Sequence, residues 1–252
     1  MKKVVCLFLC LALLLAPACG KTASDGSGAA SPSGGAPDQQ VPGKIEFVYE
    51  APTAPTFAVP DNVVQQFVTL VRPFNTCPQA FTDPAQLNDF TLFFAAAGYL
   101  DGSFIASGDN YTYSISLDKF PAAIRTLFGD GAALSDDYRS NSYEPYAIDG
   151  DTVYKYGTGG LYFPFYTFAV VPLEEGYELW LLDLMDENVM NDPSLSQLVE
   201  FGEADSITWS MLEPFWSDMQ TNVYTLKSGA DGNYYIAGFR YENFKNVEHY
   251  MI

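Results

Sequence analysis

Three stretches in the first half of the chain repeat apolar residues at intervals of three and four positions, the spacing of one face of an α-helix. They start at Pro60-Asp61, Asp83-Pro84 and Asp118, and they end after Phe74, near Gly98 or Gly102, and at Gly129. Pro or Asp at the start and Gly at the end are common helix boundaries. The apolar positions are Val63, Val64, Phe67, Val68, Val71 and Phe74; Leu87, Phe90, Phe94 and Ala97; and Phe120, Ala123, Ile124, Leu127 and Phe128. The sequence therefore predicts three amphipathic helices.

After Gly131 the chain is rich in Val, Tyr, Phe and Trp, which favour strands. Strands are expected near 143–148, 151–156, 164–172, 177–185, 220–227 and 233–241, and an earlier one at 111–115. Turn sequences at 173–176 and 228–232 predict hairpins, and 193–201 predicts a short helix. This order indicates an α+β fold, with N-terminal amphipathic helices packed on one face of a mainly antiparallel β-sheet.

The N-terminal segment follows neither pattern. Lys2 and Lys3 precede an apolar run from Val4 to Leu15, and the small residues Ala16-Pro17-Ala18 come directly before Cys19. A basic start, a short apolar run and a small-residue cleavage site form a secretory signal. The run is shorter than the roughly 20 residues that span a bilayer. We therefore expect residues 1–18 to be a signal peptide.

The end of this signal resembles the lipobox of bacterial lipoproteins. In that family the cysteine receives a diacylglyceryl group and becomes the mature N-terminus, which implies lipidation of Cys19 and a place on the outer face of the cell membrane. The chain departs from the pattern at one position, because Ala16 stands where leucine is usual and Leu15 lies one residue further out. Ala16-Pro17-Ala18 also fits an ordinary cleavage site, which would release a soluble protein.

Residues 19–43 predict a flexible linker behind the lipidated cysteine. They are rich in Gly, Ser, Ala and Pro and contain no aromatic residue, so they cannot bury enough surface to offset the entropy of ordering. A coil of this length reaches about 25 to 30 Å, enough to hold a domain clear of lipid headgroups. Residues 44–252 contain every periodic segment and predict one extracytoplasmic domain, with two lobes as an alternative.

The charge balance argues against a nucleic-acid partner. The chain has 12 Lys and Arg against 31 Asp and Glu, a formal net charge of −19, and loss of Lys2 and Lys3 with the signal makes the mature protein more acidic. Phosphate binding needs a basic surface, which this composition does not provide. We interpret the acidity as a source of solubility and of repulsion from an anionic envelope, with a cation-binding role as the alternative.

Histidine and cysteine are too scarce for several kinds of catalytic or metal site. The chain has one histidine, His249, three residues from its end, where chains usually fray. Catalysis by a Ser-His-Asp or Cys-His group needs a rigidly held base. Cys77 is the only cysteine after the linker, which excludes a disulfide within the domain and argues against structural zinc. A buried thiol is the favoured role of Cys77, and no cofactor or metal is expected.

Two short motifs match known sites only in part. Ser116-Leu117-Asp118-Lys119 and Lys227-Ser228-Gly229 match two elements of penicillin-binding proteins and serine β-lactamases. The third element of that family, Ser-x-Asn or Tyr-x-Asn, does not occur between them. The glycines at 157–160 are followed by a predicted strand rather than a helix, so a turn is favoured over a phosphate loop.

Acidic residues suggest two further possibilities. The segment from Asp183 to Asp192 collects oxygen ligands that suit Ca²⁺ but lacks the spacing and the central glycine of an EF-hand, so a solvated acidic loop is favoured. Glycoside hydrolysis needs two carboxylates about 5 to 9 Å apart in a cleft. Glu178 and Asp183 lie on one predicted strand and are the better candidates for such a pair.

The aromatic residues give the main candidate for a binding site. Tyrosine and tryptophan are more numerous in the β-rich half than its core obviously requires, and exposed rings stack on sugars or on partner side chains. Because alternate residues of a strand share a face, Tyr154 and Tyr156 are expected to act together. The predicted ligand-binding residues are Tyr154, Tyr156, Tyr162 and Trp180.

Residues 105–242 resemble a domain found in many uncharacterised lipoproteins of Gram-positive bacteria. The resemblance depends on a strand, a short helix ending at Phe128-Gly129, and Tyr-rich strands interrupted at 156–160; it implies no activity. We expect a lipid-anchored, non-enzymatic binding or envelope-interaction module for a glycan or another envelope protein. The alternatives are an envelope glycan hydrolase that uses paired carboxylates and a structural domain that docks on another surface protein.

Overall fold

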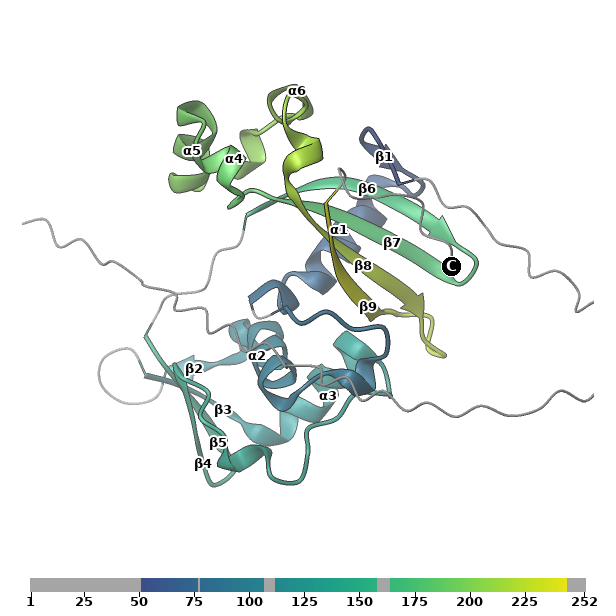
Figure 1. The fold of residues 1–252 in the computed structure, drawn as a ribbon. Coiled ribbons are helices and arrows are strands. Elements are labelled where there is room, and N and C mark those ends of the chain that lie inside the picture. Colours follow the sequence, from purple (N-terminus) through teal and green to yellow (C-terminus); the bar gives the residue numbers. More distant parts are fainter. Residues whose placement is uncertain (1–50, 77, 107–111, 158–163, 244–252) are drawn as a thin grey trace, which may run out of the picture. The chain divides into compact units, whose positions relative to one another are not determined.

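The computed structural model describes residues 51–76, 78–106, 112–157 and 164–243. The chain separates into two units, residues 1–45 and residues 46–252, and all described residues belong to the second. They form a mixed fold of two β-sheets and six α-helices (Figure 1). The predicted signal peptide, Cys19, the linker, Cys77, Tyr162 and His249 lie outside the described residues.

The helices begin and end close to the predicted boundaries in most cases. They are α1 (Asp61–Val71), α2 (Asp89–Tyr99), α3 (Phe120–Phe128), α4 (Glu187–Met190), α5 (Pro193–Glu200) and α6 (Trp209–Leu212). The three helices predicted at α1, α3 and α5 are present. However, Phe74, expected on the first helix, lies in a separate 3-10 turn (Phe74–Thr76), and Asp118, expected at the start of the third, lies in the 3-10 turn Leu117–Lys119 before it. Helix α3 ends at Gly129, whose φ of 73° is the left-handed conformation that favours glycine at this position.

The second predicted helix starts later than the sequence indicated. Asp83 caps only a single turn at Pro84–Gln86. Its side chain accepts a hydrogen bond from the Ala85 N–H, and its backbone N–H donates to Gln86 Oε1. Leu87 then adopts an extended conformation, and Asn88 caps α2 by accepting from the Thr91 N–H. Two capping residues five positions apart compete here, and only Asn88 leads into a longer helix.

The larger sheet has five strands in the order β1-β6-β7-β8-β9. Its strands are β1 (Thr56–Phe57), β6 (Phe165–Leu173), β7 (Gly176–Asp183), β8 (Gln220–Ser228) and β9 (Tyr234–Asn243). The neighbours are antiparallel except for β1, which pairs with β6 in parallel. Both predicted hairpins are confirmed. Gly176 turns the first with φ 115°, where a Cβ would collide with the Leu226 carbonyl oxygen.

The smaller sheet has four antiparallel strands in the order β2-β3-β5-β4. They are β2 (Ile105–Ala106), β3 (Thr112–Ser116), β4 (Tyr146–Asp149) and β5 (Thr152–Tyr156). The strands predicted near 111–115, 143–148 and 151–156 therefore pair with each other rather than with the later strands. The expectation of one sheet was wrong, because the strand pattern specifies each strand's buried side but not its partners.

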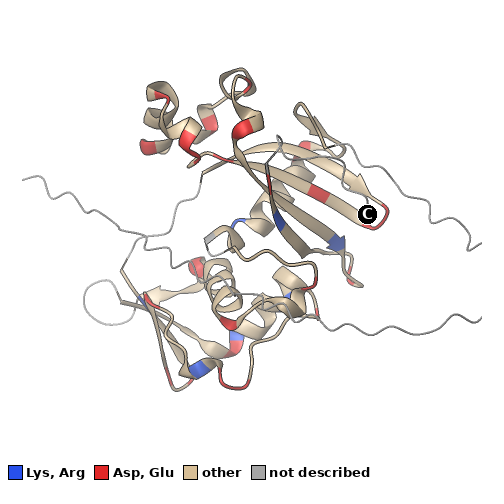
Figure 2. Ribbon diagram, in the orientation of Figure 1, with Lys and Arg blue, Asp and Glu red and all other residues tan. Residues whose placement is uncertain are grey.

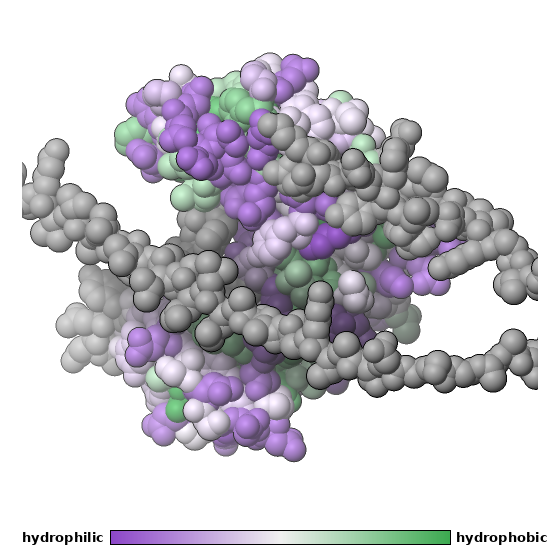
Figure 3. All heavy atoms as spheres, viewed as in Figure 1, coloured by the Kyte–Doolittle hydropathy of each residue, from purple (hydrophilic) through white to green (hydrophobic). Residues whose placement is uncertain are grey.

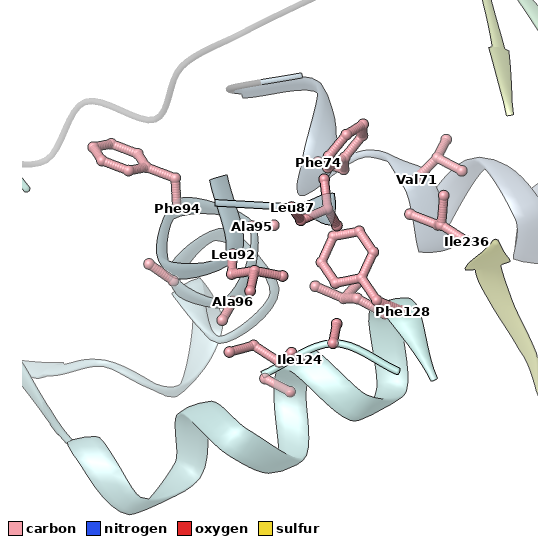
Figure 4. Packing of buried hydrophobic residues seen from close by; sticks show 14 of the residues in the cluster. Val71, Phe74, Leu87, Leu92, Phe94, Ala95, Ala96, Ile124, Phe128 and Ile236 are labelled. Atoms are coloured by element: carbon pink, nitrogen blue, oxygen red, sulfur yellow. The ribbon is translucent and has the colours of Figure 1, made fainter. Parts of the chain in front are cut away.

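Each face of the five-stranded sheet has its own hydrophobic core. On one face, Leu179, Leu181 and Tyr224 join a cluster that includes the buried sides of α1, α2 and α3 and also Ile115 and Val153 of the smaller sheet. Figure 4 shows the part of this cluster where Val71, Phe74, Phe128 and Ile236 converge from four segments. The opposite face is covered by a second cluster.

The second cluster joins this opposite face to the helices α4, α5 and α6, which lie together at one end of the sheet in Figure 1. Trp180, Leu182 and Val223 belong to it. Even-numbered residues of β7 face this cluster and odd-numbered residues face the first, as the two-residue period of a strand requires. Both faces of the sheet are therefore covered.

Candidate functional site

The predicted aromatic site is not assembled as expected. Tyr154 and Tyr156 share the outer face of β5, with Tyr154 half-buried and Tyr156 56% exposed. Trp180 lies in the other sheet and is only 1% exposed, so it must be removed from the set of surface rings. Tyr162 lies outside the described residues. The structure therefore leaves Tyr154 and Tyr156 as a pair on one strand face.

The two carboxylates proposed as a hydrolytic pair lie on opposite faces of the sheet. Glu178 and Asp183 are five residues apart in β7, whose pairing with β8 continues from Tyr177 to Leu182 without a register shift. An odd separation on a regular strand sends two side chains to opposite faces. Glu178 and Asp183 therefore cannot flank one bond of a substrate.

Glu178 belongs to a buried ionic cluster. Arg240 Nη1 donates to Glu178 Oε1 and Arg240 Nε donates to Glu242 Oε1, both at 2.6 Å. Trp180 Nε1 donates to Glu178 Oε2 at 3.1 Å, and the guanidinium lies 5.5 Å from the Trp180 ring centroid. Burial opposes the charged form of Arg240, but hydrogen bonds and attraction from the two glutamates outweigh it and raise the Arg240 pKa. These carboxylates are occupied by the arginine between them.

The acidic segment from Asp183 to Asp192 caps backbone groups. Asp183 Oδ1 accepts from the Met185 N–H, Asp186 accepts from the N–H groups of Asn188 and Gln220, and Asp192 caps α5. Burial raises the pKa of Asp183, although the Met185 bond opposes the rise. Among the described residues, no group of three or more His, Cys, Asp or Glu side chains has an arrangement that could hold a metal ion.

The partial match to penicillin-binding proteins is not assembled into a site either. Ser116 and Lys119 lie at the end of β3 and in the turn that follows, whereas Lys227 lies near the end of β8 in the other sheet. Lys227 Nζ contacts Glu175 Oε2 at 3.1 Å. These placements give no reason to assign a nucleophilic role to Ser116.

A groove of about 510 Å³ lies along the solvent side of α1. We call it the uncharged groove. Helix α1 contributes Asn62, Gln65, Gln66, Phe67, Thr69 and Leu70, and the remaining lining residues are Tyr99, Thr126, Gly232, Asn233 and Tyr234. The four polar residues of α1 recur at intervals of three and four, so they share one face of the helix. All four are exposed, opposite the buried stripe that fixes α1 to the core.

Aromatic packing fixes one wall of the uncharged groove. The Tyr234 ring meets the buried Phe67 ring edge-on, with centroids 4.9 Å apart, and lies 5.9 Å from the Tyr177 ring. Phe67 lines the groove but is only 1% exposed. Tyr99, the last residue of α2, is 45% exposed. The groove therefore combines a fixed ring, an exposed ring and a row of amide side chains.

Among the residues that the structure describes, those that line the groove include no charged side chain. This differs from the rest of the described surface, on which acidic residues are spread over helices and loops and basic residues are few (Figure 2). The visible part of the described surface in Figure 3 is mainly hydrophilic, with small apolar areas between. The described lining of the groove thus includes no carboxylate, although the chain as a whole has a net charge of −19.

The sequence analysis missed the groove, although part of its signal was present. The exposed side of the first predicted helix carries only Asn, Gln and Thr between Asp61 and Arg72, and an uncharged polar face is unusual in so acidic a chain. Tyr99 and Tyr234 come from segments distant in sequence. Only tertiary packing brings them to this helix, because Tyr99 ends α2 and Tyr234 begins β9.

Comparisons with protein-family models, with curated proteins and with solved structures found no match. In the part of the chain that the structure describes, no helix combines the length and apolarity needed to cross a membrane. The functional argument therefore depends on the chemistry of the residues themselves.

Proposed function

We propose that this protein is a non-catalytic binding module, attached to the cell envelope through a lipid on Cys19, and that the uncharged groove binds a neutral polar ligand such as a glycan. The observation that carries the proposal is the lining of the groove. Rings and amide groups without any charge match a ligand rich in hydroxyl and amide groups.

The chemistry of the lining favours a neutral ligand for two reasons. Each amide side chain of Asn62, Gln65 and Gln66 offers both a donor and an acceptor, so it can pair with hydroxyl or acetamido groups in either sense. The exposed Tyr99 ring provides a flat apolar surface for the apolar face of a sugar. A neutral ligand also avoids the cost of removing a charge from water.

The alternative of a glycan hydrolase has less support. Its best carboxylate pair lies on opposite faces of β7, and Glu178 and Glu242 both bond to Arg240. A docking domain remains the other alternative for the same groove. We also propose that the first helices of the chain cover one face of the larger sheet, an arrangement that the contacts of α1 and α3 with β9 support.

The groove is tested with the chain from residue 19 onward, carrying Cys19→Ala so that it is unlipidated. We expect it to bind at least one uncharged N-acetylated oligosaccharide in a glycan panel. Tyr99→Ala should weaken that binding about tenfold or more, since a ring at the centre of a contact usually contributes over 1.4 kcal/mol. The measurement is isothermal titration calorimetry.

The matched control is Tyr156→Ala, which removes a ring of similar exposure from the smaller sheet. It should leave oligosaccharide affinity unchanged. If Tyr156→Ala abolished binding and Tyr99→Ala did not, the site would be on the outer face of β5 instead. If the panel gave no neutral ligand, the groove proposal would be rejected.

The anchor is tested separately in cells of a lipoprotein-producing bacterium. A diacylglyceryl group supplies two acyl chains, which hold a protein firmly on a membrane, whereas one chain does so only marginally. Cys19→Ala should therefore move the protein from the membrane fraction to the medium or leave the unprocessed precursor. An unchanged fractionation and an unchanged mass of the mature protein would exclude lipidation of Cys19.

A further inference from the structure

Several polar side chains of the uncharged groove already use their hydrogen-bond donors within the protein. Thr69 Oγ1 and Thr126 Oγ1 each donate to a carbonyl oxygen of their own helix, at 2.7 and 3.0 Å. Asn233 Nδ2 donates to Asp231 Oδ2 at 2.8 Å. All three donor side chains line the groove. Their donors are therefore less available to a ligand than those of the other amides in the lining.

The other amides lie near the start of α1. Asn62, Gln65 and Gln66 fall within the first six residues of this helix and are exposed. Within the part of the chain that the structure describes, their side chains have no hydrogen-bond partner. Each of these side chains carries one acceptor oxygen and an NH₂ donor group. We call this part of the groove the amide end.

The opposite end of the groove is apolar and aromatic. Leu70 lines it near the C-terminal end of α1. Tyr99 lies at the same end because its neighbour Gly98 packs on Pro73, just beyond α1: a Cβ added to Gly98 would lie 3.4 Å from the Pro73 Cα. Asn62 and Leu70 are eight residues apart, which corresponds to about 12 Å along the helix axis. We call this part the aromatic end.

An acetamido group suits the amide end better than a hydroxyl group does. The N–H and C=O of a planar trans amide point in opposite directions, so each needs a partner of its own. Asn62 and either Gln65 or Gln66 are neighbours on the helix face, about 5 to 6 Å apart at Cβ, and can supply one acceptor and one donor. A hydroxyl group carries both functions on one oxygen, so the two side chains would have to converge on a single point.

The aromatic end does not make this distinction. The exposed Tyr99 ring offers a flat apolar surface to the apolar face of a sugar ring, and that contact does not depend on whether the sugar carries an acetamido or a hydroxyl substituent. The two ends of the groove therefore differ in what they can recognise.

We infer that the groove binds a linear oligosaccharide in one fixed direction along α1, with an N-acetylated sugar unit at the amide end and the next unit stacked on Tyr99 at the aromatic end. One helical turn, about 5.4 Å, is close to the length of a sugar ring, so the distance from Asn62 to Leu70 accommodates two units. This inference rests on the proposed function of the groove, and it specifies the ligand class as an oligosaccharide of at least two units whose acetamido group is on a defined unit.

The experiment uses four disaccharides that share one linkage and are N-acetylated on both rings, on either ring alone, or on neither. The chain from residue 19 onward with Cys19→Ala is titrated with each by isothermal titration calorimetry. We expect the two singly acetylated disaccharides to differ about tenfold in affinity, because one of them places a hydroxyl group at the amide end and loses bonds to two amides. The tighter of the two should bind as well as the doubly acetylated disaccharide.

The variant Asn62→Leu should remove the difference between the two singly acetylated disaccharides. Asn62 belongs to both possible amide pairs, since Gln65 and Gln66 are consecutive and do not face each other. Gln197→Leu is the matched control, because Gln197 is an exposed amide on α5 that does not line the groove, and it should retain the difference.

The variant Tyr99→Ala provides a second readout, which a general loss of binding would not reproduce. It should weaken both singly acetylated disaccharides by the same factor, about tenfold, and therefore leave the ratio of their affinities unchanged. Thermal melts check that each variant is folded.

The outcomes separate this inference from the proposed function. Equal affinity of the two singly acetylated disaccharides for the unsubstituted chain, or a difference that survives Asn62→Leu, overturns the fixed direction but leaves the groove proposal intact. Failure of all four disaccharides to bind also overturns it, and if no other neutral oligosaccharide binds, the proposed function is rejected as well.

Discussion

The two sheets of this protein differ in how much of each face the hydrophobic clusters cover. The five-stranded sheet is covered on both faces by hydrophobic clusters, and β7 has five consecutive buried residues. Among the described residues, the four-stranded sheet joins a hydrophobic cluster through one face, with Ile115 and Val153, and the buried residues of β5 alternate with more exposed ones. The packing above each ring, rather than its residue type, decides whether it reaches solvent: Trp180 is 1% exposed and Tyr156 is 56% exposed.

The same difference applies to charged side chains as well as to aromatic rings. On the doubly covered sheet, Glu178 and Glu242 are buried and both bond to Arg240, which lies beside Trp180. On the singly covered sheet, Tyr156 on the outer face remains exposed. Trp180, Glu178 and Glu242 of the larger sheet are therefore part of the core, and loss of their contacts should affect stability first.

The largest effect is expected from Trp180→Ala. The variant leaves a cavity where a fully buried indole packs and removes the hydrogen bond to Glu178. Truncation of a buried tryptophan usually costs about 3–5 kcal/mol of the free energy of unfolding. Urea denaturation followed by circular dichroism measures this change.

The counterpart on the other sheet is Tyr156→Ala, which should change the free energy of unfolding by no more than about 0.5 kcal/mol. If Trp180→Ala and Tyr156→Ala reduced the free energy of unfolding by similar amounts, the comparison would fail. Such a result would mean that the exposed Tyr156 ring stabilises the fold as much as the buried Trp180 ring.

An effect between those of Trp180→Ala and Tyr156→Ala is expected from Arg240→Met. The variant leaves two buried carboxylates without their cation. Breaking a fully buried ion pair costs about 3–5 kcal/mol; since the Arg240 side chain is 34% exposed, solvent screening reduces the expected loss to about 2 kcal/mol at pH 7. The measurement is the same denaturation experiment at pH 7 and at pH 5.

The pH dependence separates charge from packing in the Arg240→Met variant. Without the arginine, the folded state favours protonated carboxylates and binds more protons than the unfolded state, so stability falls as pH rises. The deficit relative to the unsubstituted chain should therefore be smaller at pH 5 than at pH 7. An equal deficit at both values would indicate that only the packing of Arg240 on Trp180 matters.

Local structure was predicted well from the sequence because its signals are local. The apolar stripe of α1 and the glycine after α3 are written in consecutive residues, and the structure has both elements at the expected positions. The start of α2 was predicted less well, since Asp83 and Asn88 are both good capping residues and no local rule ranks them. Strand positions were predicted better than strand partners.

The candidate site shows the same limit more clearly. Trp180 was predicted as a surface ring because tyrosine and tryptophan in the β-rich half outnumber what its core obviously requires, but α4 to α6 contribute to the core on that face of the sheet. Glu178 and Asp183 were the better candidates for a pair because they lie on one predicted strand, but strand alternation sends them to opposite faces. In each case the deciding neighbour comes from a distant segment.

The sequence by itself determined the composition of each surface: the apolar stripe of α1, its uncharged outer side and the acidity of the chain. It also determined the hairpins, because turn residues act over a few positions. Only the tertiary structure decided that Tyr99 and Tyr234 line the same groove as that helix face, and that Trp180 is buried. The physical reason is that periodicity along a chain reports which side of an element is buried, whereas the partner that covers it is chosen by packing between segments far apart in sequence.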